Sequence, residues 1–346
     1  ISYPTNTIFA LGNDELTTFF LVKNTTVLNN KIKNNSAFLF NNINEFNSID
    51  NTILTIGTFD GVHLGHQKVL ERLTNAAKEN NLESTVLTFF PHPRTILNPN
   101  KPLKLINSVK ERTDLLKRSK IDNLIIHPFD KIFSELDPEK YVVEVLVKKL
   151  KAKIILIGYD HKFGKNRTAD ITDLKEYGEK YGFKVIEIKA EEISNIAISS
   201  TKIRKAISEG NISTTKKYLG YDFSLSGEIV HGKSIGRTLG FPTANIEVKE
   251  EYKLLPKNGV YLIQSVIDHN KYFGMMNIGI KPTISKSSKT IEVNFFDFEG
   301  NLYDKKITVN IKQFIRDERK FDSLELLKSQ IHKDKINCNS IIDIID

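Results

Sequence analysis

The sequence predicts a two-domain protein in which a doubly wound α/β domain precedes a small antiparallel β-barrel. Three observations lead to this expectation. The chain has 346 residues, enough for two domains with sizeable cores. Between about residues 36 and 190, short apolar runs alternate with helical patterns. From about residue 223 onward, apolar and polar residues alternate with a period of two, and turns containing Gly or Asn-Gly separate the runs.

The first half contains five short apolar runs that we expect to form buried parallel strands, because they consist mostly of Ile, Leu and Val. These strands are expected at Thr52–Gly57, Ser84–Phe90, Asp122–His127, Lys153–Gly158 and Phe183–Ile188. Helices are expected between them, at Leu64–Asn80, Ser108–Ser119, Pro138–Leu150 and Ile171–Tyr181. Residues 1–35 are rich in Asn and Thr and form an N-terminal extension to which we assign no role.

Ligands of doubly wound sheets bind at the carboxyl ends of the strands, so the residues that follow each strand are candidate site residues. The first strand leads into residues 57–66, Gly-Thr-Phe-Asp-Gly-Val-His-Leu-Gly-His. Asp160 follows the fourth strand, and the loop after the fifth leads to residues 198–204. Polar, ring-bearing and basic residues therefore gather at one edge of the predicted sheet.

The turn after the first strand has the features of a phosphate-binding site. Its glycines allow a ligand to approach the backbone, and the N-terminus of the following helix offers unpaired N–H groups. His63 and His66 share one side of the first helical turn, and each can donate to a phosphate oxygen. We take Gly57, Phe59, Asp60 and Gly61 as candidate nucleotide-binding residues of this turn. The alternative is an ordinary strand-to-helix turn whose histidines only cap the helix.

A second helix start, near residue 199, repeats this chemistry. Ser199, Ser200 and Thr201 can cap the helix, and Arg204 lies in its first turn. Hydroxyl groups, unpaired N–H groups and a cation at one helix start are suited to a polyphosphate. The alternative is a plain Ser/Thr cap on a surface helix.

The second half is expected to form the barrel from five runs with period-two alternation. They lie at Leu225–Val230, Gly259–Ile267, Tyr272–Ile278, Thr290–Phe298 and Lys306–Phe314. A helical segment with one apolar stripe follows at Ser323–Asp334. We therefore expect the α/β domain at residues 36–210, a linker at residues 211–222, and the barrel domain with its C-terminal helix at residues 223–346.

A glycine-rich basic segment at residues 231–245 lies inside the barrel half. Gly236, Arg237 and Gly240 belong to a flap suited to phosphates, although the spacing is not that of a P-loop. Thr243 and Asn245 would point the same way in an extended chain, and their neutral oxygens suit Mg²⁺ held beside ATP phosphates. Glu292 alternates with apolar residues on a predicted strand, and it becomes a candidate general base only if the flap closes over its face.

The amino-acid composition indicates which kinds of partner the protein binds and in which compartment we expect it. The formal net charge of +8 and the pI of about 9.1 favour anionic partners. The basic residues form no block of five or six, so nucleic-acid binding stays a minority hypothesis. No apolar run approaches the roughly 20 residues that a membrane-spanning helix needs. The single cysteine, Cys338, is interpreted as a bystander thiol of a reducing compartment, and we expect a cytoplasmic protein. Because the chain begins with Ile, we expect a preceding residue or short leader to be missing.

These motifs, in this order, resemble the bacterial bifunctional riboflavin kinase/FMN adenylyltransferases, also called FAD synthetases, from about residue 36 to about residue 334. In the first half the shared motifs are residues 57–66, Phe-Pro-His-Pro at 90–93, Gly-Tyr-Asp-His-Lys-Phe-Gly at 158–164 and Ile-Ser-Ser-Thr-Lys-Ile-Arg at 198–204. In the second half they are residues 236–245, Gly-Val-Tyr at 259–261, Asn-Ile-Gly at 277–279 and Ile-Arg-Asp-Glu-Arg-Lys-Phe at 315–321.

The resemblance implies a Rossmann-like nucleotidyltransferase domain and a riboflavin kinase barrel, which use Mg²⁺, take ATP as co-substrate and bind FMN and FAD as products. It implies that the barrel phosphorylates riboflavin to FMN, and that the α/β domain adenylylates FMN to FAD with release of pyrophosphate. His63 and His66 would stabilise the phosphates, Asp160 would bind the adenylylation substrates, and the 199–204 segment would hold the leaving phosphates.

In the barrel half, the resemblance implies Thr243 and Asn245 as Mg²⁺ and ATP ligands and Glu292 as the base. It places Pro91, His92, Pro93, Asn277, Arg316 and Phe321 near the flavin. The chain departs from the family pattern at Thr58, Ala169 and Asn294. Two other classes of protein remain as alternatives. A non-catalytic flavin- or nucleotide-binding module would be indicated by loss of the catalytic residues. A nucleic-acid-binding protein would be indicated by an affinity for nucleic acid that falls steeply with salt.

Overall fold

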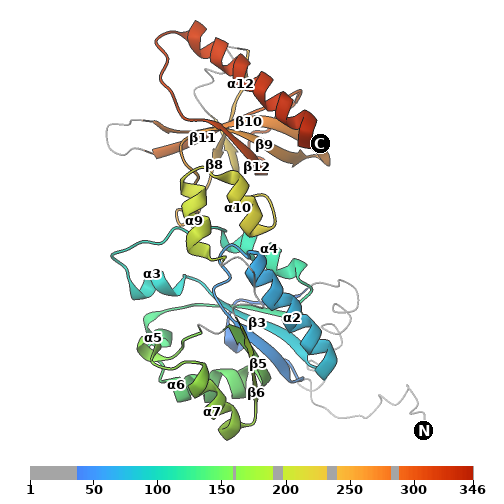
Figure 1. Cartoon of the computed structure of the whole chain (residues 1–346), viewed down its shortest axis with the longest axis vertical. Helices are drawn as coiled ribbons and strands as arrows, with labels where there is room; N and C mark the ends of the chain where they lie inside the picture. The colour runs from blue at the N-terminus through green and yellow to red at the C-terminus, as the bar shows by residue number, and fades with distance from the viewer. Residues whose placement is uncertain (1–36, 159–160, 190–197, 232–239, 282–287, 346) are drawn as a thin grey trace, which may run out of the picture.

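The computed structural model describes residues 37–158, 161–189, 198–231, 240–281 and 288–345. In the described part of the chain, an α/β domain and a closed β-barrel lie one above the other, and the helices α9 (Ser200–Ser208) and α10 (Ile212–Leu219) lie between them (Figure 1). Both predicted fold classes are therefore confirmed.

The α/β domain is built on a parallel sheet with the strand order β1-β4-β3-β2-β5-β6. Its strands are β1 (Phe38–Phe40), β2 (Thr52–Ile56), β3 (Glu83–Phe89), β4 (Asn123–His127), β5 (Ala152–Gly158) and β6 (Lys184–Ile188). All but the three-residue edge strand β1 were predicted. The strand order reverses between β2 and β5, so the turn after β2 lies at the topological switch point, where such sheets bind ligands.

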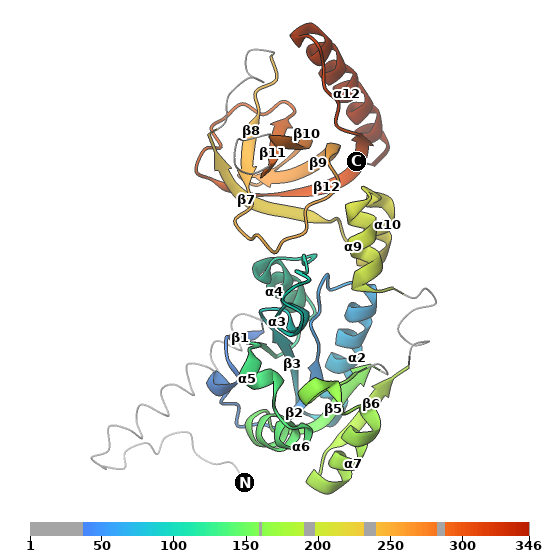
Figure 2. The ribbon, with the colours of Figure 1, turned by 90° about the vertical axis from the view of Figure 1, so that its left-hand side faces the viewer.

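Helices cover both faces of this sheet because successive strand residues point to opposite sides. Ile53 of β2 packs in one apolar cluster with α2 (Leu64–Asn80) and α4 (Val109–Arg118). Leu54 packs in another, with η2 (Tyr141–Lys149) and α7 (Ile171–Tyr181). Figure 1 shows α2 on one side of the strands and α5 and α6 on the other, and Figure 2, turned by 90°, shows the strands spread across the view from β1 to β6. The remaining short helices are η1 (Ile43–Glu45), α3 (Pro93–Leu97), α5 (Lys131–Ser134), α6 (Pro138–Lys140) and η3 (Lys165–Arg167).

The barrel closes through antiparallel pairs in the order β10-β11-β8-β7-β12-β9. Its strands are β7 (Ser224–Val230), β8 (Ala244–Glu247), β9 (Gly259–Ile267), β10 (Asn270–Lys281), β11 (Ser288–Phe295) and β12 (Lys306–Arg316). The sequence predicted five of these six strands. It missed β8 because only four residues are paired there, and so short an alternation cannot be distinguished from that of a loop.

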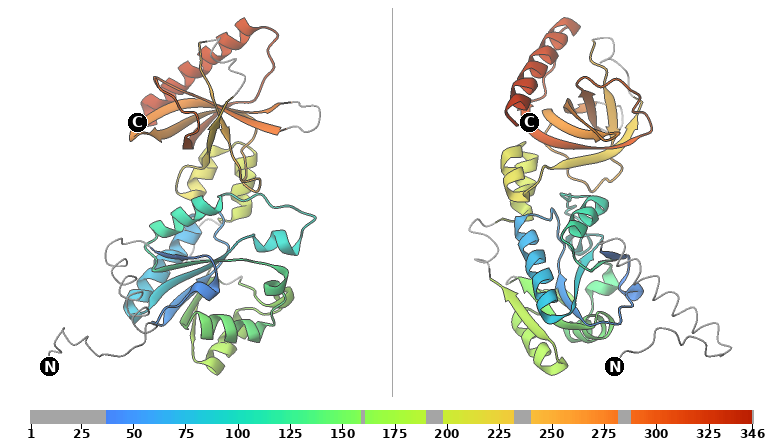
Figure 3. Two further views of the ribbon diagram at one scale, coloured as in Figure 1. Left: turned by 180° about the vertical axis from the view of Figure 1, so that it is seen from behind. Right: turned by 90° about the vertical axis from the view of Figure 1, so that its right-hand side faces the viewer.

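The C-terminal helix α12 (Leu324–Ile345) lies along the outer wall of the barrel, as the two views in Figure 3 show. It is longer than the predicted helix at 323–334. The extension is stabilised because Cys338 joins Leu262, Met275 and Phe296 of the barrel wall in a buried apolar cluster. The apolar stripe of α12 therefore continues beyond the segment in which the sequence pattern was clear.

The helices α9 and α10, which lie between the two domains, pack into the apolar core of the barrel domain. Residues 211–222, which we expected to be a linker, contain the whole of α10. Ile203 and Ile207 of α9, and Ile212 and Leu219 of α10, lie in the same buried cluster as the barrel interior. The helix that carries the predicted 199–204 phosphate site is thus packed against the second domain.

Candidate active sites

The turn between β2 and α2 is sharply folded. Phe59, Gly61 and Val62 have positive φ angles of 48°, 89° and 32°. A Cβ atom on Gly61 would lie 2.9 Å from the Ile106 Cδ1 atom, so both the conformation and the space require glycine there. The Phe59 side chain is buried and faces the His66 ring, which indicates a packing role for this predicted nucleotide-binding residue. The turn therefore presents mainly backbone and histidine groups.

His63 and His66 are stacked, with ring centroids 3.6 Å apart and an angle of 16° between the planes. His63 caps α2, because its Nδ1 accepts a hydrogen bond of 3.3 Å from the His66 N–H. Burial lowers the pKa of His63 to about 4. Burial also lowers the pKa of His66 well below its usual value, and the neighbouring His63 and Arg112 add to this effect. Both rings are thus neutral at pH 7 in this structure.

Asp60 connects the turn after β2 to two other segments of the chain. Its buried carboxylate accepts hydrogen bonds from the Ile106 N–H at 2.9 Å and from Arg204 Nη2 at 2.6 Å. Burial raises the pKa of Asp60, and the Arg204 guanidinium and two backbone N–H groups oppose that shift. The Asp60 carbonyl oxygen in turn accepts a hydrogen bond of 2.9 Å from Ser200 Oγ. Asp60 therefore joins the turn after β2 to the start of α9.

The N-terminus of α9 completes this site. Ser199 caps the helix, accepting a hydrogen bond of 3.3 Å from the Lys202 N–H, whereas Thr201 is exposed. Because Ser200 is bonded to the turn itself, the N-termini of α2 and α9 lie close to the same loop. Two helix N-termini beside one glycine turn can bind two groups of a polyphosphate chain. The structure thus brings Asp60, Ser200 and Arg204 to the sheet edge where the sequence predicted candidate site residues, and it bonds Ser200 and Arg204 to Asp60.

Arg112 on α4 is a site residue that sequence reasoning missed. Its guanidinium is buried and donates to the Thr58 carbonyl at 2.7 Å and to the Phe89 carbonyl at 3.0 Å. It therefore fastens the residues that follow β2 to the end of β3. The sequence carried no signal for this role, because an arginine in an amphipathic helix is ordinarily on the solvated face.

The loop after β3 lies next to the same charged groups. His92 is buried and caps α3, its Nδ1 accepting a hydrogen bond of 3.1 Å from the Arg94 N–H. Burial lowers the pKa of His92 to about 4, with further contributions from Arg204, Arg112 and Arg94. Pro93 is the first residue of α3, and Pro91 is exposed. The predicted site residue Asp160 lies outside the described residues.

In the barrel, three predicted site residues lie in one row across neighbouring strands. Glu292 on β11 is directly opposite Asn245 on β8 and directly opposite Asn277 on β10. Residues opposite each other in antiparallel strands point to the same face of the sheet. The neighbouring residues Ile291 and Val293 belong to the barrel interior, so this row faces outward. The barrel thus places a carboxylate between two side-chain amides.

The segment before β8 is held against this row. Asn294 Nδ2, at one of the positions that depart from the family pattern, donates a hydrogen bond of 2.8 Å to the Pro242 carbonyl. This bond fixes the backbone next to Thr243, which is half-buried. Gly240 has a positive φ of 84° and open space around its Cα. Gly236 and Arg237 lie outside the described residues.

Arg316, predicted to lie near the flavin, forms an ion pair with α12. Its Nε and Nη2 atoms donate to the Asp334 carboxylate at 3.0 Å and 2.8 Å. Phe321 lies under the guanidinium, with 5.8 Å between the Arg316 Cζ atom and the ring centroid. Arg316 therefore anchors the C-terminal helix beside the Glu292-bearing wall.

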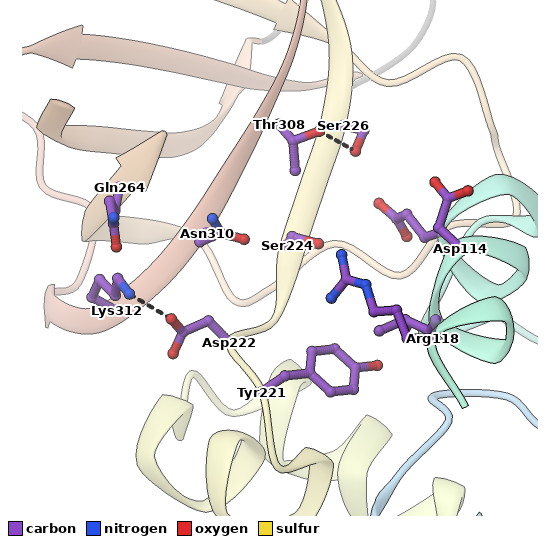
Figure 4. Close-up of a pocket in the computed structure, with 12 residues that line it drawn as sticks. Asp114, Arg118, Tyr221, Asp222, Ser224, Ser226, Gln264, Thr308, Asn310 and Lys312 are labelled. Carbon is purple, nitrogen blue, oxygen red and sulfur yellow. Dashed lines mark hydrogen bonds and ion pairs between the residues drawn. The ribbon is translucent and has the colours of Figure 1, made fainter. Parts of the chain in front are cut away.

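A separate polar pocket of about 350 Å³ lies between α4 and the barrel (Figure 4). Asp114 and Arg118 line it from α4, and Ser224, Asp222 and Lys312 line it from the barrel side. It contains none of the predicted site residues, so it is not part of either site described above.

Comparisons with known proteins agree with this division into two sites. Residues 46–202 match the FAD synthetase family model, and residues 219–342 match the riboflavin kinase family model. A bifunctional riboflavin kinase/FMN adenylyltransferase of Buchnera aphidicola is 42% identical over 85% of this chain and 94% of its own length. The bifunctional riboflavin kinase/FMN adenylyltransferase of Escherichia coli K12 is 32% identical over 84% of this chain and 93% of its own length.

The chain belongs to the bifunctional riboflavin kinase/FMN adenylyltransferase family. The α/β domain is its FMN adenylyltransferase part, and the barrel is its riboflavin kinase part. A solved structure described as a macrolide-efflux protein from Streptococcus pneumoniae has the same fold, with a TM-score of 0.79 and 32% identity over 88% of this chain and 98% of that one. Among the described residues, no helix is both long enough and apolar enough to cross a membrane.

Proposed function

We propose that the α/β site transfers AMP from ATP to FMN through the residues gathered around Asp60. A phosphate oxygen of FMN attacks the α-phosphorus, and the bond to the pyrophosphate breaks. His63 and His66 donate hydrogen bonds to the transferring phosphates. Ser199, Ser200, Thr201 and Arg204 bind the departing pyrophosphate. Gly57 and Gly61 allow the backbone to approach the nucleotide, and Asp160 binds the adenylylation substrates.

In the barrel, Glu292 acts as the general base of riboflavin phosphorylation. It accepts the proton of the riboflavin 5′-hydroxyl while that oxygen bonds to the γ-phosphorus of ATP and ADP leaves. The observation that carries this proposal is the row of Asn245, Glu292 and Asn277 across β8, β11 and β10. It places the carboxylate next to two amide groups that can orient a hydroxyl and a phosphate.

Thr243 and Asn245 fit Mg²⁺ because they offer only oxygen ligands beside a carboxylate. Among the described residues, no group of three or more His, Cys, Asp or Glu side chains forms a dedicated metal site. A magnesium ion that keeps several waters and is shared with ATP phosphates needs only such a small donor set. The ion would neutralise charge on the transferring phosphate, and Thr243 and Asn245 would hold it in place.

The flavin contacts are assigned to the residues that surround these groups. Asn277, Arg316 and Phe321 would contact riboflavin, and Pro91, His92 and Pro93 would contact FMN in the α/β domain. Gly236, Arg237 and Gly240 would cover the phosphates of the kinase site. We also propose a cytoplasmic location, which is supported by the use of ATP as co-substrate.

The test is chromatographic analysis of flavins after incubation with riboflavin and Mg-ATP, with Glu292→Gln and His66→Ala as paired variants. The wild-type chain should form FMN and then FAD. Glu292→Gln should abolish FMN formation and leave FAD synthesis from supplied FMN intact, and His66→Ala should do the reverse. Loss of both reactions in either variant would contradict the assignment of one site to each reaction. Flavin binding without any turnover of the wild-type chain would favour a non-catalytic module.

A further inference from the structure

The segment from Lys104 to Asn107 lies between the barrel domain and the adenylylation site. On its barrel side, the Leu105 N–H donates to the Tyr252 carbonyl at 2.7 Å, and the Leu254 N–H donates to the Leu105 carbonyl at 2.7 Å. These two bonds form a short parallel bridge between the two domains. The loop before β9 therefore fixes the backbone of a segment that belongs to the α/β domain.

Lys253 lies in this bridge and is almost completely buried, with 1% of its side chain exposed. Its Nζ donates to the Ile106 carbonyl at 2.7 Å and to Glu111 Oε2 at 2.5 Å. The ammonium group also lies 4.5 Å from the centre of the Phe223 ring. Burying a lysine ammonium group costs free energy unless hydrogen bonds and an opposite charge compensate for it. These partners therefore fix the position of the Lys253 side chain.

The opposite side of the same segment holds the catalytic turn. The Ile106 and Asn107 N–H groups both point to Asp60 Oδ1, at 2.9 Å and 3.4 Å. Arg204 Nε donates to the Lys104 carbonyl at 3.1 Å while its Nη2 binds Asp60. Ile106 is therefore bound at its carbonyl by the barrel domain and at its N–H by the phosphate-binding turn.

We propose that Lys253, a residue of the riboflavin kinase domain, is a positioning residue for FMN adenylylation. It fixes Ile106, whose N–H orients the Asp60 carboxylate. Asp60 in turn orients Arg204 and the Gly57–His66 turn. The kinase domain thus contributes to the other domain's active site through one buried side chain. This inference rests on the assignment of adenylylation to the site around Asp60.

The experiment uses the full-length chain with Lys253→Met and Lys253→Arg, and both reactions are measured on the same protein. Lys253→Met should lower kcat/KM for adenylylation of supplied FMN by about tenfold or more, because small displacements of positioning groups have large kinetic effects. Phosphorylation of riboflavin by the same preparation should be unchanged. Lys253→Arg should recover part of the lost adenylylation.

Two further variants separate positioning from simple loss of stability. Lys312→Met removes another ion pair near the domain boundary, where Lys312 Nζ lies 2.5 Å from Asp222 Oδ2, and it should leave adenylylation unchanged. The double variant Lys253→Met/Glu111→Gln also removes the negative charge of Glu111, which the single variant leaves without its ion-pair partner, and it should keep the adenylylation defect.

The proposal would be overturned if Lys253→Met left adenylylation intact, if it lowered both reactions equally, or if Lys312→Met had the same effect. Full recovery in the double variant would also overturn it, because the defect would then come from the unpaired Glu111. The variant His66→Ala distinguishes a wrong role for Lys253 from a wrong assignment of adenylylation to the site around Asp60. If His66→Ala also leaves adenylylation intact, the reaction is not catalysed around Asp60 at all.

Discussion

Arg204, the fifth residue of α9, donates a 2.6 Å hydrogen bond to the buried carboxylate of Asp60, which lies 144 residues earlier in the turn after β2. The side chain of Asp60 is 1% exposed and that of Arg204 is 15% exposed. This ion pair joins the two helix starts that were each expected to bind phosphate. It therefore fixes the distance between the two halves of the proposed nucleotide site.

Replacing Asp60 with Asn should lower both stability and FMN adenylylation. The amide can still accept from the Ile106 N–H, but Arg204 loses its charged partner in a buried position. Breaking one side of a buried pair typically costs about 3–5 kcal/mol. Thermal unfolding followed by circular dichroism should show a lower melting temperature, and chromatography should show little FAD from supplied FMN. Asp114→Asn, at an exposed ion pair with Lys110, should change neither. An unaffected Asp60→Asn variant would mean that the pair does not organise the site.

The sequence indicated both halves of the proposed nucleotide site because each half carries a local signal. Glycines, histidines and hydroxyl residues at helix starts are recognisable within about ten residues. The Asp60–Arg204 pair, and the roles of Arg112 and Lys253, could not be predicted in this way. They depend on which buried polar atoms the fold brings together across long distances in the chain. An arginine or lysine in a polar stretch has the same local pattern whether it is solvated or buried.

The elements that the sequence missed are those whose pairing is short. Strands β1 and β8 have three and four residues, so neither shows enough alternation to be distinguished from a loop. β8 is nevertheless the strand that places Asn245 opposite Glu292. Thr243 and Asn245 were predicted as ligands from their chemistry, whereas the row that Asn245 shares with Glu292 became visible only through the register.

Stability should fall as the pH decreases from about 6.5 to about 4. Burial lowers the pKa of His63 and of His92 to about 4, whereas these groups titrate near 6.5 in the unfolded chain. Between these values the unfolded chain binds more protons, so acid favours unfolding. Each histidine should account for about 2 kcal/mol of lost stability between pH 7.5 and pH 5.

The measurement compares the melting temperatures of wild type and His92→Asn at pH 7.5 and pH 5. Asparagine can replace the histidine as the cap of α3 but does not titrate. The variant should therefore lose less stability in acid than wild type does. His269→Asn, at an exposed position, should behave as wild type. Asp60 has a raised pKa, so its protonation opposes the loss of stability in acid. The informative quantity is therefore the difference between wild type and His92→Asn in the melting temperature lost between pH 7.5 and pH 5.

The ion pair between Arg316 and Asp334 should hold α12 against the barrel and support riboflavin phosphorylation. Asp334 also accepts a hydrogen bond of 2.8 Å from Gln330, and its side chain is 5% exposed. Asp334→Asn should lower the melting temperature and the rate of FMN formation, because Arg316 and Phe321 lose their fixed position. FAD synthesis from supplied FMN should be unchanged. Asp343→Asn, on an exposed part of the same helix, should have no effect on any of these measurements.

The thiol of Cys338 should be protected in the folded protein and should report on the docking of α12. Cys338 is fully buried between α12 and the barrel wall, and burial raises the pKa of its thiol to about 12. Alkylation requires both the thiolate and solvent access, so iodoacetamide at pH 8 should label the native chain very slowly and the urea-unfolded chain rapidly. Labelling then requires α12 to open, and its rate measures how often that happens. Asp334→Asn should speed labelling of the native protein, and Asp343→Asn should not. Rapid labelling of the wild-type chain would show that α12 does not stay docked, and the proposed contribution of Arg316 to the flavin site would fail with it.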